Sequence, residues 1–134
     1  PLRRQRQMCI RDRADISNMK DLFSGYDLIL VDSTLESAYN PKKFLEGVHK
    51  RLNPNGLLII ASSYAWDESK TDRNQWLGGF KIDGENTTTL DALQSLLSPY
   101  FKQIAEPIDV DQVIRKTRRT FDHNVLQVTI WERD

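Results

Sequence analysis

Two short apolar runs in the first half of the chain predict strands that are buried on both faces. The first run covers residues 26–31 and the second covers residues 57–61. Each run is continuous rather than alternating, which is typical of a parallel sheet. Polar turn residues precede each run, Ser24-Gly25 before the first and residues 53–56 before the second. We therefore expect two adjacent parallel strands.

A helix is predicted between these two runs. Asn40 is a favourable N-cap residue, and Pro41 suits the first helical position. Apolar residues then recur along one helical face, at Phe44, Leu45, Val48 and Leu52. The segment 41–52 thus completes a strand–helix–strand unit, for which a right-handed parallel crossover is expected.

The middle of the chain changes character. Residues 62–87 are polar with aromatic interruptions and predict a long loop, which in a compact domain is often functional. A second helix is expected over residues 88–98. Thr88 and Asp91 form a T-x-x-D pattern that favours its start, and Pro99 favours its end.

The C-terminal third predicts three elements. Residues 101–108 resemble a short strand, and residues 124–132 are rich in strand-forming side chains. Between them a helical period is kept by Val110, Val113, Ile114 and Thr117. Together the elements predict an α/β fold, the C-terminal half of a doubly wound, Rossmann-like sheet with a C-terminal antiparallel strand. Such sheets bind ligands beyond the carboxyl ends of their strands.

Composition narrows the class of protein. The chain has 134 residues, 39% hydrophobic and 28% charged, which suits one globular domain. Basic and acidic residues number 19 each, so no strong net charge attracts nucleic acid or an anionic membrane. No apolar run approaches the roughly 20 residues of a membrane span. The one cysteine, Cys9, excludes an internal disulfide and suits a cytoplasmic protein.

The charge balance hides a basic N-terminus. Residues 1–13 hold five arginines and one acid and show neither a helical nor a strand period. The segment could be a nucleic-acid-binding arm or a disordered end, and it also resembles translated sequencing-adapter sequence, which would make it non-native. We exclude it from the fold and assign residues 14–134 to a partial domain. On the adapter interpretation, the natural protein is longer on its N-terminal side.

Several short motifs resemble one enzyme family. The pattern L-x-P-x-G-x-L between Leu52 and Leu58, after the 26–31 run, resembles the fourth and fifth strands of class I S-adenosylmethionine-dependent methyltransferases. Downstream segments are similar to the C-terminal domain of ovothiol synthases, the 4-mercaptohistidine N1-methyltransferase attached to 5-histidylcysteine sulfoxide synthase. These segments are residues 63–66, 76–80, 88–91, 113–115 and 123–132.

This resemblance covers about residues 14–134 and implies a reaction. The domain would transfer a methyl group from S-adenosylmethionine to an imidazole nitrogen of a thiohistidine, in ovothiol biosynthesis. It also implies partners, namely the small-molecule substrate and an N-terminal half of the parent chain that includes an iron-dependent sulfoxide synthase domain.

The sequence departs from that family in its cofactor site. No G-x-G occurs, whereas the family has a glycine-rich loop after its first strand, and its ribose-binding acid has no counterpart. Asp15 followed by Asn18 resembles a D-x-x-N segment whose aspartate lies near the adenine. Asp32 and Ser62 directly follow the two predicted parallel strands. Asp15, Asp32 and Ser62 are therefore the predicted cofactor-binding residues.

Aromatic residues of the long loop are candidates for contacting cofactor and substrate. Methyl transfer to a neutral nitrogen mainly needs alignment and exclusion of water. Tyr64, as a catalytic residue, and Trp66, as a substrate contact, could form walls around a sulfonium. Trp76, near Gly78, could close over the substrate. Each could instead be a packing residue of the loop.

Two further candidates lie near the C-terminus. Arg115 could bind the substrate carboxylate through its planar guanidinium, or belong to a solvated basic face. His123 could accept a proton from the substrate imidazole, or be structural. No Cys/His cluster has metal-ligand spacing, so no metal site is predicted. The alternative function is a non-catalytic α/β binding module that has lost its cofactor site.

Overall fold

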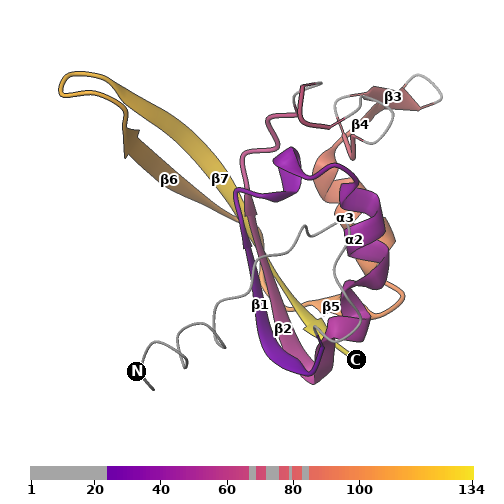
Figure 1. Cartoon of the computed structure of the whole chain (residues 1–134). Coiled ribbons are helices and arrows are strands. Elements are labelled where there is room, and N and C mark those ends of the chain that lie inside the picture. Colours follow the sequence, from indigo (N-terminus) through magenta and orange to yellow (C-terminus); the bar gives the residue numbers. More distant parts are fainter. Residues whose placement is uncertain (1–23, 67–68, 72–75, 79, 83–84) are drawn as a thin grey trace, which may run out of the picture.

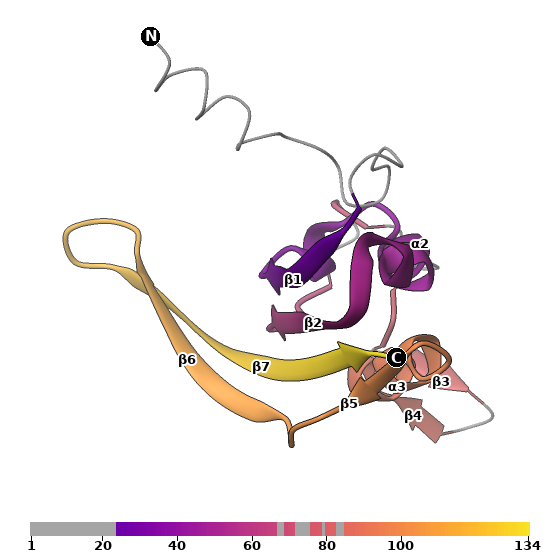
Figure 2. The same ribbon diagram turned by 90° about the horizontal axis from the view of Figure 1, so that it is seen from below.

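The computed structural model describes residues 24–66, 69–71, 76–78, 80–82 and 85–134. A mixed sheet forms one layer, and two helices pack on one of its faces (Figures 1 and 2). In chain order the elements are β1 (Tyr26–Asp32), η1 (Leu35–Ser37), α2 (Pro41–Gly47), η2 (Val48–Arg51), β2 (Leu52–Ser62), β3 (Phe80–Ile82), β4 (Glu85–Thr87), α3 (Thr89–Leu97), β5 (Phe101–Gln103), β6 (Ile108–Arg115) and β7 (Phe121–Arg133).

The parallel pair is confirmed. β1 and β2 pair in parallel with a register that runs from Leu28 opposite Leu57 to Asp32 opposite Ala61. The two apolar runs thus lie side by side, and the two strands end at the same edge of the sheet.

The helix between these strands is shorter than predicted. Asn40 caps α2, its side chain accepting a hydrogen bond from the backbone N–H of Lys43 at 3.1 Å. The α-helix ends at Gly47, and η2 carries the chain as a 3₁₀-helix to Arg51. The 3₁₀ geometry keeps Val48 in the core while the chain turns into β2.

The remaining strands complete the sheet around β7. The strand order is β1-β2-β7-β5, and β6 also pairs with β7. All pairings of β7 are antiparallel, which confirms the predicted C-terminal antiparallel strand. The α/β fold class is therefore the predicted one.

The helical prediction for residues 110–117 is wrong. These residues lie mainly in β6, which pairs with β7 from Ile108 opposite Val128 to Arg115 opposite Phe121. The apolar positions Val110, Val113 and Ile114 fit a helical period by coincidence, and cross-strand pairing decides the outcome. The predicted strand over 101–108 is also too long, because β5 ends at Gln103 and β6 begins only at Ile108.

Of the two predictions for the middle of the chain, the loop is wrong in part and the helix is confirmed. Instead of being loop throughout, residues 62–87 include a short antiparallel hairpin of β3 and β4. The second helix is confirmed as α3, and its N-cap is Thr88, whose hydroxyl accepts from the Asp91 N–H at 3.2 Å.

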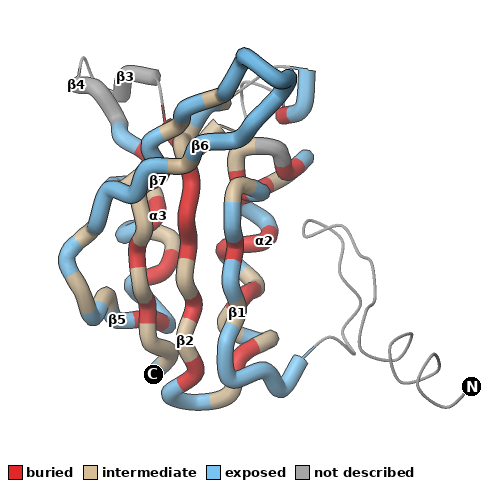
Figure 3. Tube along the Cα trace, turned by 90° about the vertical axis from the view of Figure 1, so that its left-hand side faces the viewer, coloured by how far each residue is buried: buried red, intermediate tan, exposed pale blue. Residues whose placement is uncertain are grey.

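The core lies between the sheet and the helices. Its members come from β1, β2 and β7 on one side and from α2, η2 and α3 on the other, among them Val31, Leu58, Ile60, Trp131, Phe44, Leu45, Val48, Leu93 and Leu97. The opposite face of the sheet carries Leu28 and Leu30, whose side chains are 56% and 61% exposed. No described element packs on that face, which is turned toward the viewer in Figure 3.

Candidate functional site

Polar groups gather where β1 and β2 end side by side. Ser33 follows β1 with a φ of 55° in the left-handed region, and its backbone N–H donates to the Ala61 carbonyl at 2.8 Å. Its hydroxyl donates to the Asp32 carboxylate at 3.0 Å. Asp32 remains exposed at the carboxyl edge of the sheet. The contact of Asp32 with a ligand stays a prediction.

Ser62 is buried and already holds two hydrogen bonds. Its hydroxyl donates to the Glu36 carboxylate at 2.5 Å and accepts from the backbone N–H of Tyr64 at 3.0 Å. The Ser62 hydroxyl thus ties η1, which carries Glu36, to the end of β2. Ser62 shapes this edge of the sheet from within the protein.

Tyr64 is the best-defined side chain of the site. Its φ of 57° turns the chain sharply after β2, and its hydroxyl donates to the Gln127 side-chain oxygen of β7 at 2.9 Å. Burial raises the pKa of Tyr64 to about 12, and the charge of Glu36 contributes to the rise. The phenol therefore stays protonated at neutral pH and acts as a hydrogen-bond donor rather than as a base.

The two predicted tryptophans are anchored by their indole N–H groups. Trp66 donates to the Thr89 hydroxyl at 3.1 Å and packs against the core. Trp76 donates to the Thr71 carbonyl at 3.0 Å. Thr71 is fully buried, and its hydroxyl bonds the carbonyls of Ala38 and Glu36. These contacts fix the loop after β2 onto α3 and η1, in keeping with the packing interpretation.

Arg115 and His123 lie apart from this cluster, on the β6–β7 hairpin that projects from the sheet (Figure 1). The Arg115 guanidinium donates to the carbonyls of Thr117 and Arg118 at 3.1 and 3.3 Å, so it closes the hairpin turn. His123 Nε2 lies 3.2 Å from the Asp111 carboxylate, and both side chains are exposed. Asp15, the third predicted cofactor contact, lies outside the described residues.

Glu36 and Gln127 complete the cluster and were missed in the sequence. Both contacts join distant parts of the sequence, since Glu36 meets Ser62 across 26 positions and Gln127 meets Tyr64 across 63. The acid shortly after β1 was a usable signal for Glu36. Within the described ranges, no three His, Cys, Asp or Glu side chains are grouped to hold a metal ion. Nor has any helix there the length and apolar character to cross a membrane.

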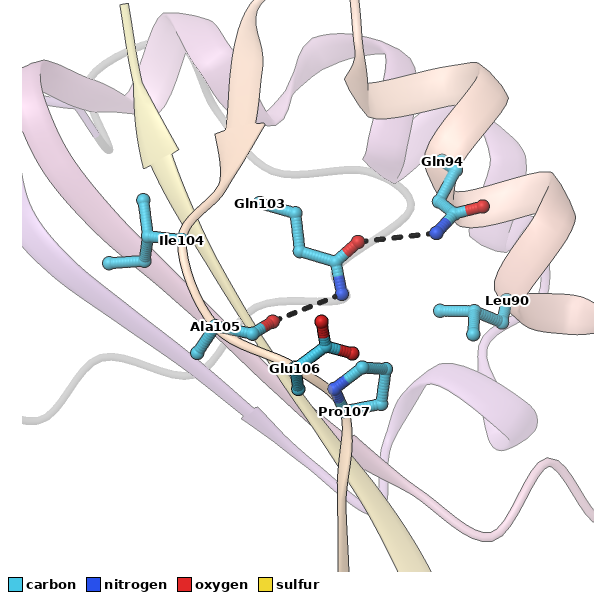
Figure 4. Close-up of a pocket in the computed structure, with 7 residues that line it drawn as sticks. All are labelled: Leu90, Gln94, Gln103, Ile104, Ala105, Glu106 and Pro107. Carbon is cyan, nitrogen blue, oxygen red and sulfur yellow. Dashed lines mark hydrogen bonds between the residues drawn. The ribbon is translucent and has the colours of Figure 1, made fainter.

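A separate pocket of about 560 Å³ lies between α3 and the chain that links β5 to β6 (Figure 4). Its lining shares no residue with the cluster at the ends of β1 and β2, and consists of Leu90, Gln94, Gln103, Ile104, Ala105, Glu106 and Pro107. The Gln103 side chain spans it by two hydrogen bonds, from Gln94 at 3.2 Å and to the Ala105 carbonyl at 3.3 Å.

Comparison with known proteins identifies the fold. No family model matches the chain, and no curated protein matches it in sequence. A structure solved for the conversion of a disulfide bond into a thioacetal group during echinomycin biosynthesis is similar, with a TM-score of 0.58 and 12% identity. The similarity covers 90% of this chain and 54% of that one.

Two methyltransferases show the same likeness. N-methyltransferase NodS from Bradyrhizobium japonicum WM9, solved with S-adenosyl-L-homocysteine, has a TM-score of 0.52 and 15% identity over 90% of this chain and 52% of its own. A SAM-dependent methyltransferase from Methanosarcina mazei has a TM-score of 0.51 and 18% identity over 89% of this chain and 64% of its own. The described part therefore has the fold of class I S-adenosylmethionine-dependent methyltransferases. It spans about half the length of the first two structures.

Proposed function

We propose that the chain is part of an S-adenosylmethionine-dependent methyltransferase whose methyl acceptor is an imidazole nitrogen of 4-mercaptohistidine. The observation that carries the methyltransferase assignment is the polar cluster of Asp32, Glu36, Ser62, Tyr64 and Gln127. It lies at the carboxyl ends of adjacent strands, where doubly wound sheets bind their ligands. The resemblance of the downstream motifs to ovothiol synthases supports the choice of acceptor.

The described residues fit part of a cofactor site. The exposed Asp32 carboxylate can accept hydrogen bonds from a ribose or an ammonium group. The Tyr64 ring, held in place by Gln127, can face a sulfonium. The sequence holds no glycine-rich loop to let the backbone approach a nucleoside closely. We therefore assign the remaining contacts to an N-terminal half of a longer parent, which would also carry the iron-dependent sulfoxide synthase domain.

Methyl transfer to a neutral imidazole nitrogen needs little acid–base catalysis from this chain. S-adenosylmethionine, when bound, supplies an electrophilic methyl group on a positively charged sulfur. The protein has to align the imidazole nitrogen with that methyl carbon and exclude water. Tyr64 suits this role because its phenol stays neutral, and we assign the exclusion of water in part to the anchored Trp66 and Trp76. His123 and Arg115, the predicted proton acceptor and carboxylate contact, lie on the β6–β7 hairpin apart from this cluster, so this step is proposed without them. We assign the enzyme to the cytoplasm, in line with its single cysteine.

The test compares the longer parent with the 134-residue chain. Each protein is incubated with S-adenosylmethionine and 4-mercaptohistidine, and the product is analysed by mass spectrometry. The proposal predicts a methylated thiohistidine from the parent only. If the parent binds S-adenosylmethionine but leaves 4-mercaptohistidine unmodified, the acceptor is wrong and the methyltransferase assignment stands.

The alternative is a non-catalytic α/β interaction module. One observation favours it, namely that Ser62, Trp66 and Arg115 each use their polar groups within the chain. A parent that does not bind S-adenosylmethionine would support this alternative over the enzyme.

A further inference from the structure

The β6–β7 hairpin forms an arm, defined here as residues 106–127, that projects beyond the helix-covered part of the sheet (Figures 1 and 2). β7 pairs with β2 from Glu132 to Gln127, and from there to Phe121 it pairs only with β6 among the described residues. The arm is therefore a two-stranded ribbon over most of its length. Such ribbons have little stability of their own without a further strand or a covering layer.

Among the described strands, both edges of the ribbon are open beyond Gln127, and the β6 edge is open over the whole strand. β6 pairs with β7 on one side, and no described strand pairs with its other side. Its eight residues contain no proline and no lysine, and its charged residues are Asp109, Asp111 and Arg115. An edge strand without proline offers its free backbone N–H and C=O groups to another strand, and its charges restrict which partner fits.

The arm also exposes an unusual amount of apolar surface. Ile108, Val110 and Ile114 alternate along one face of β6, and Val113 lies on the other. Together with two residues of β7 these side chains are between 44% and 62% exposed, as listed for Ile108, Val110, Val113, Ile114, Phe121 and Val125. An added strand would bury part of both faces at once.

Charge is distributed along the arm with opposite signs at its two ends. The base carries exposed acids at Glu106, Asp109 and Asp111, whereas the tip carries the exposed residues Lys116, Arg118 and Arg119. Lys116 bonds to Asp122 at 3.2 Å within the tip, which leaves Arg118 and Arg119 as its outward cations. An antiparallel partner of the same kind would bring a basic tip against an acidic base twice, once at each end.

We propose that β6 pairs antiparallel with β6 of a second copy of this chain, about a two-fold axis near Gln112, to form a four-stranded sheet. With that centre, Val110 lies opposite Ile114 of the second copy, and Glu106 lies opposite Arg118. Such a self-complementary contact is the usual form of a symmetric dimer. In this register Glu106 lies opposite Arg118 of the second copy, and Asp109 lies opposite its Arg115.

Two hydrogen bonds of Gln103 connect the base of the arm to α3. Gln103 connects α3, through Gln94, to the backbone carbonyl of Ala105 just before β6 begins (Figure 4). The contact uses only the edge of β6. It therefore leaves uncovered the face of β7 that carries His123 and Gln127. The inference is therefore independent of the proposed methyl transfer.

The first experiment reverses the charges at one end of the arm at a time. Glu106→Lys/Asp109→Lys makes the whole arm basic, and Arg118→Glu/Arg119→Glu makes it acidic. Sedimentation of the unmodified chain at about 100 μM should show a dimer, since even a weak contact is populated there. Each doubly substituted chain should dissociate about tenfold more readily, because opposite charges across the axis become like charges. Mixing the two variants should restore the dimer.

The outcome is decisive in both directions. Restoration by mixing supports the arm-to-arm contact, because no other surface predicts that the two variants prefer each other. A chain that sediments as a monomer overturns the proposal. So does association that is equal in all four samples, because it would arise from another surface, such as the exposed face around Leu28 and Leu30.

A second experiment locates the axis. Gln112→Cys in a Cys9→Ser background should form an intermolecular disulfide on mild oxidation, since opposite residues of antiparallel strands lie within disulfide range. Val125→Cys in the same background is the matched control, because Val125 is exposed but lies on β7, whose free edge at this position faces away from β6. Two copies of it would be separated by three strand spacings, roughly 14 Å. Equal cross-linking of both variants would contradict the proposed pairing.

Discussion

The two faces of the sheet are built from the same apolar runs and have opposite surroundings. In β2, Leu58 and Ile60 are fully buried beneath α2 and α3, while Leu57 and Ile59 alternate with them and are only partly covered. In β1, Val31 is buried and Leu30 is largely exposed. A continuous apolar run is typical of a strand whose two faces are both covered. The described elements cover only one face of this sheet.

The largest expected effect concerns ligand binding. If the remaining cofactor contacts come from a longer parent, the 134-residue chain alone should not bind S-adenosylmethionine at micromolar concentration. Several hydrogen bonds to charged groups, each worth about 1.5–3 kcal/mol, would be missing from the about 8 kcal/mol of a micromolar site. Isothermal titration measures this directly. Micromolar binding by a monodisperse sample would show that the 134-residue chain alone provides the contacts that the cofactor needs.

Truncating one leucine on each face tests the comparison by stability. Leu58→Ala opens a cavity in the core and should lower the free energy of unfolding by about 3 kcal/mol. Leu30→Ala removes an exposed side chain and should cost less than about 1 kcal/mol. Urea denaturation of both variants gives the two values. Equal losses would mean that the Leu30 face is covered in solution, for example by association.

A smaller effect is expected at the junction of loop and sheet. Tyr64→Phe removes the hydroxyl that bonds Gln127 and should lower the free energy of unfolding by about 1 kcal/mol. In the longer parent, the same variant keeps the ring face and should retain most binding of S-adenosylmethionine. Tyr64→Leu is the matched comparison, because it removes the aromatic face as well. Similar affinities for both variants would argue against a ring facing the sulfonium.

The smallest expected effect is a pH dependence of the free energy of unfolding, which arises from His49 in η2. His49 stacks on Tyr100 with ring centroids 3.6 Å apart, and burial, followed by the charges of Arg133 and Lys50, lowers its pKa below 6.5. The unfolded state therefore takes up a proton before the folded state does. The stability contribution is fully present above pH 6.5 and is lost as pH falls below that value. Urea midpoints of the unmodified chain and of His49→Gln should converge as the pH is lowered; parallel curves would contradict this.

Local signals sufficed where an element is defined by its own residues. Asn40 and Thr88 mark the starts of α2 and α3, and both caps are made as the sequence predicts. Local signals failed for β6, because its apolar residues fit a helical period of 3.6 residues as well as a strand period of 2. The pairing of Val113 with His123 in β7, rather than any local preference, determines its conformation.

The candidate site divides in the same way. Asp32, Ser62 and Tyr64 could be found because they follow strands, and the ends of adjacent parallel strands meet. Gln127 could not be found, because its role depends on β7 entering the sheet next to β2. The residue type of Arg115 predicts a carboxylate contact, whereas its two carbonyl partners follow from its place in a tight turn and could not be predicted; the carboxylate contact stays a prediction.

The length of β7 has a consequence for the site. The strand runs without interruption over 13 residues, from the free arm through the middle of the sheet to the core residue Trp131. Gln127 lies where the arm meets the sheet, and it holds the Tyr64 hydroxyl. At Gln127 the two-stranded arm becomes part of the wider sheet, so the residue that holds the Tyr64 hydroxyl lies at the boundary between the less and the more supported parts of β7.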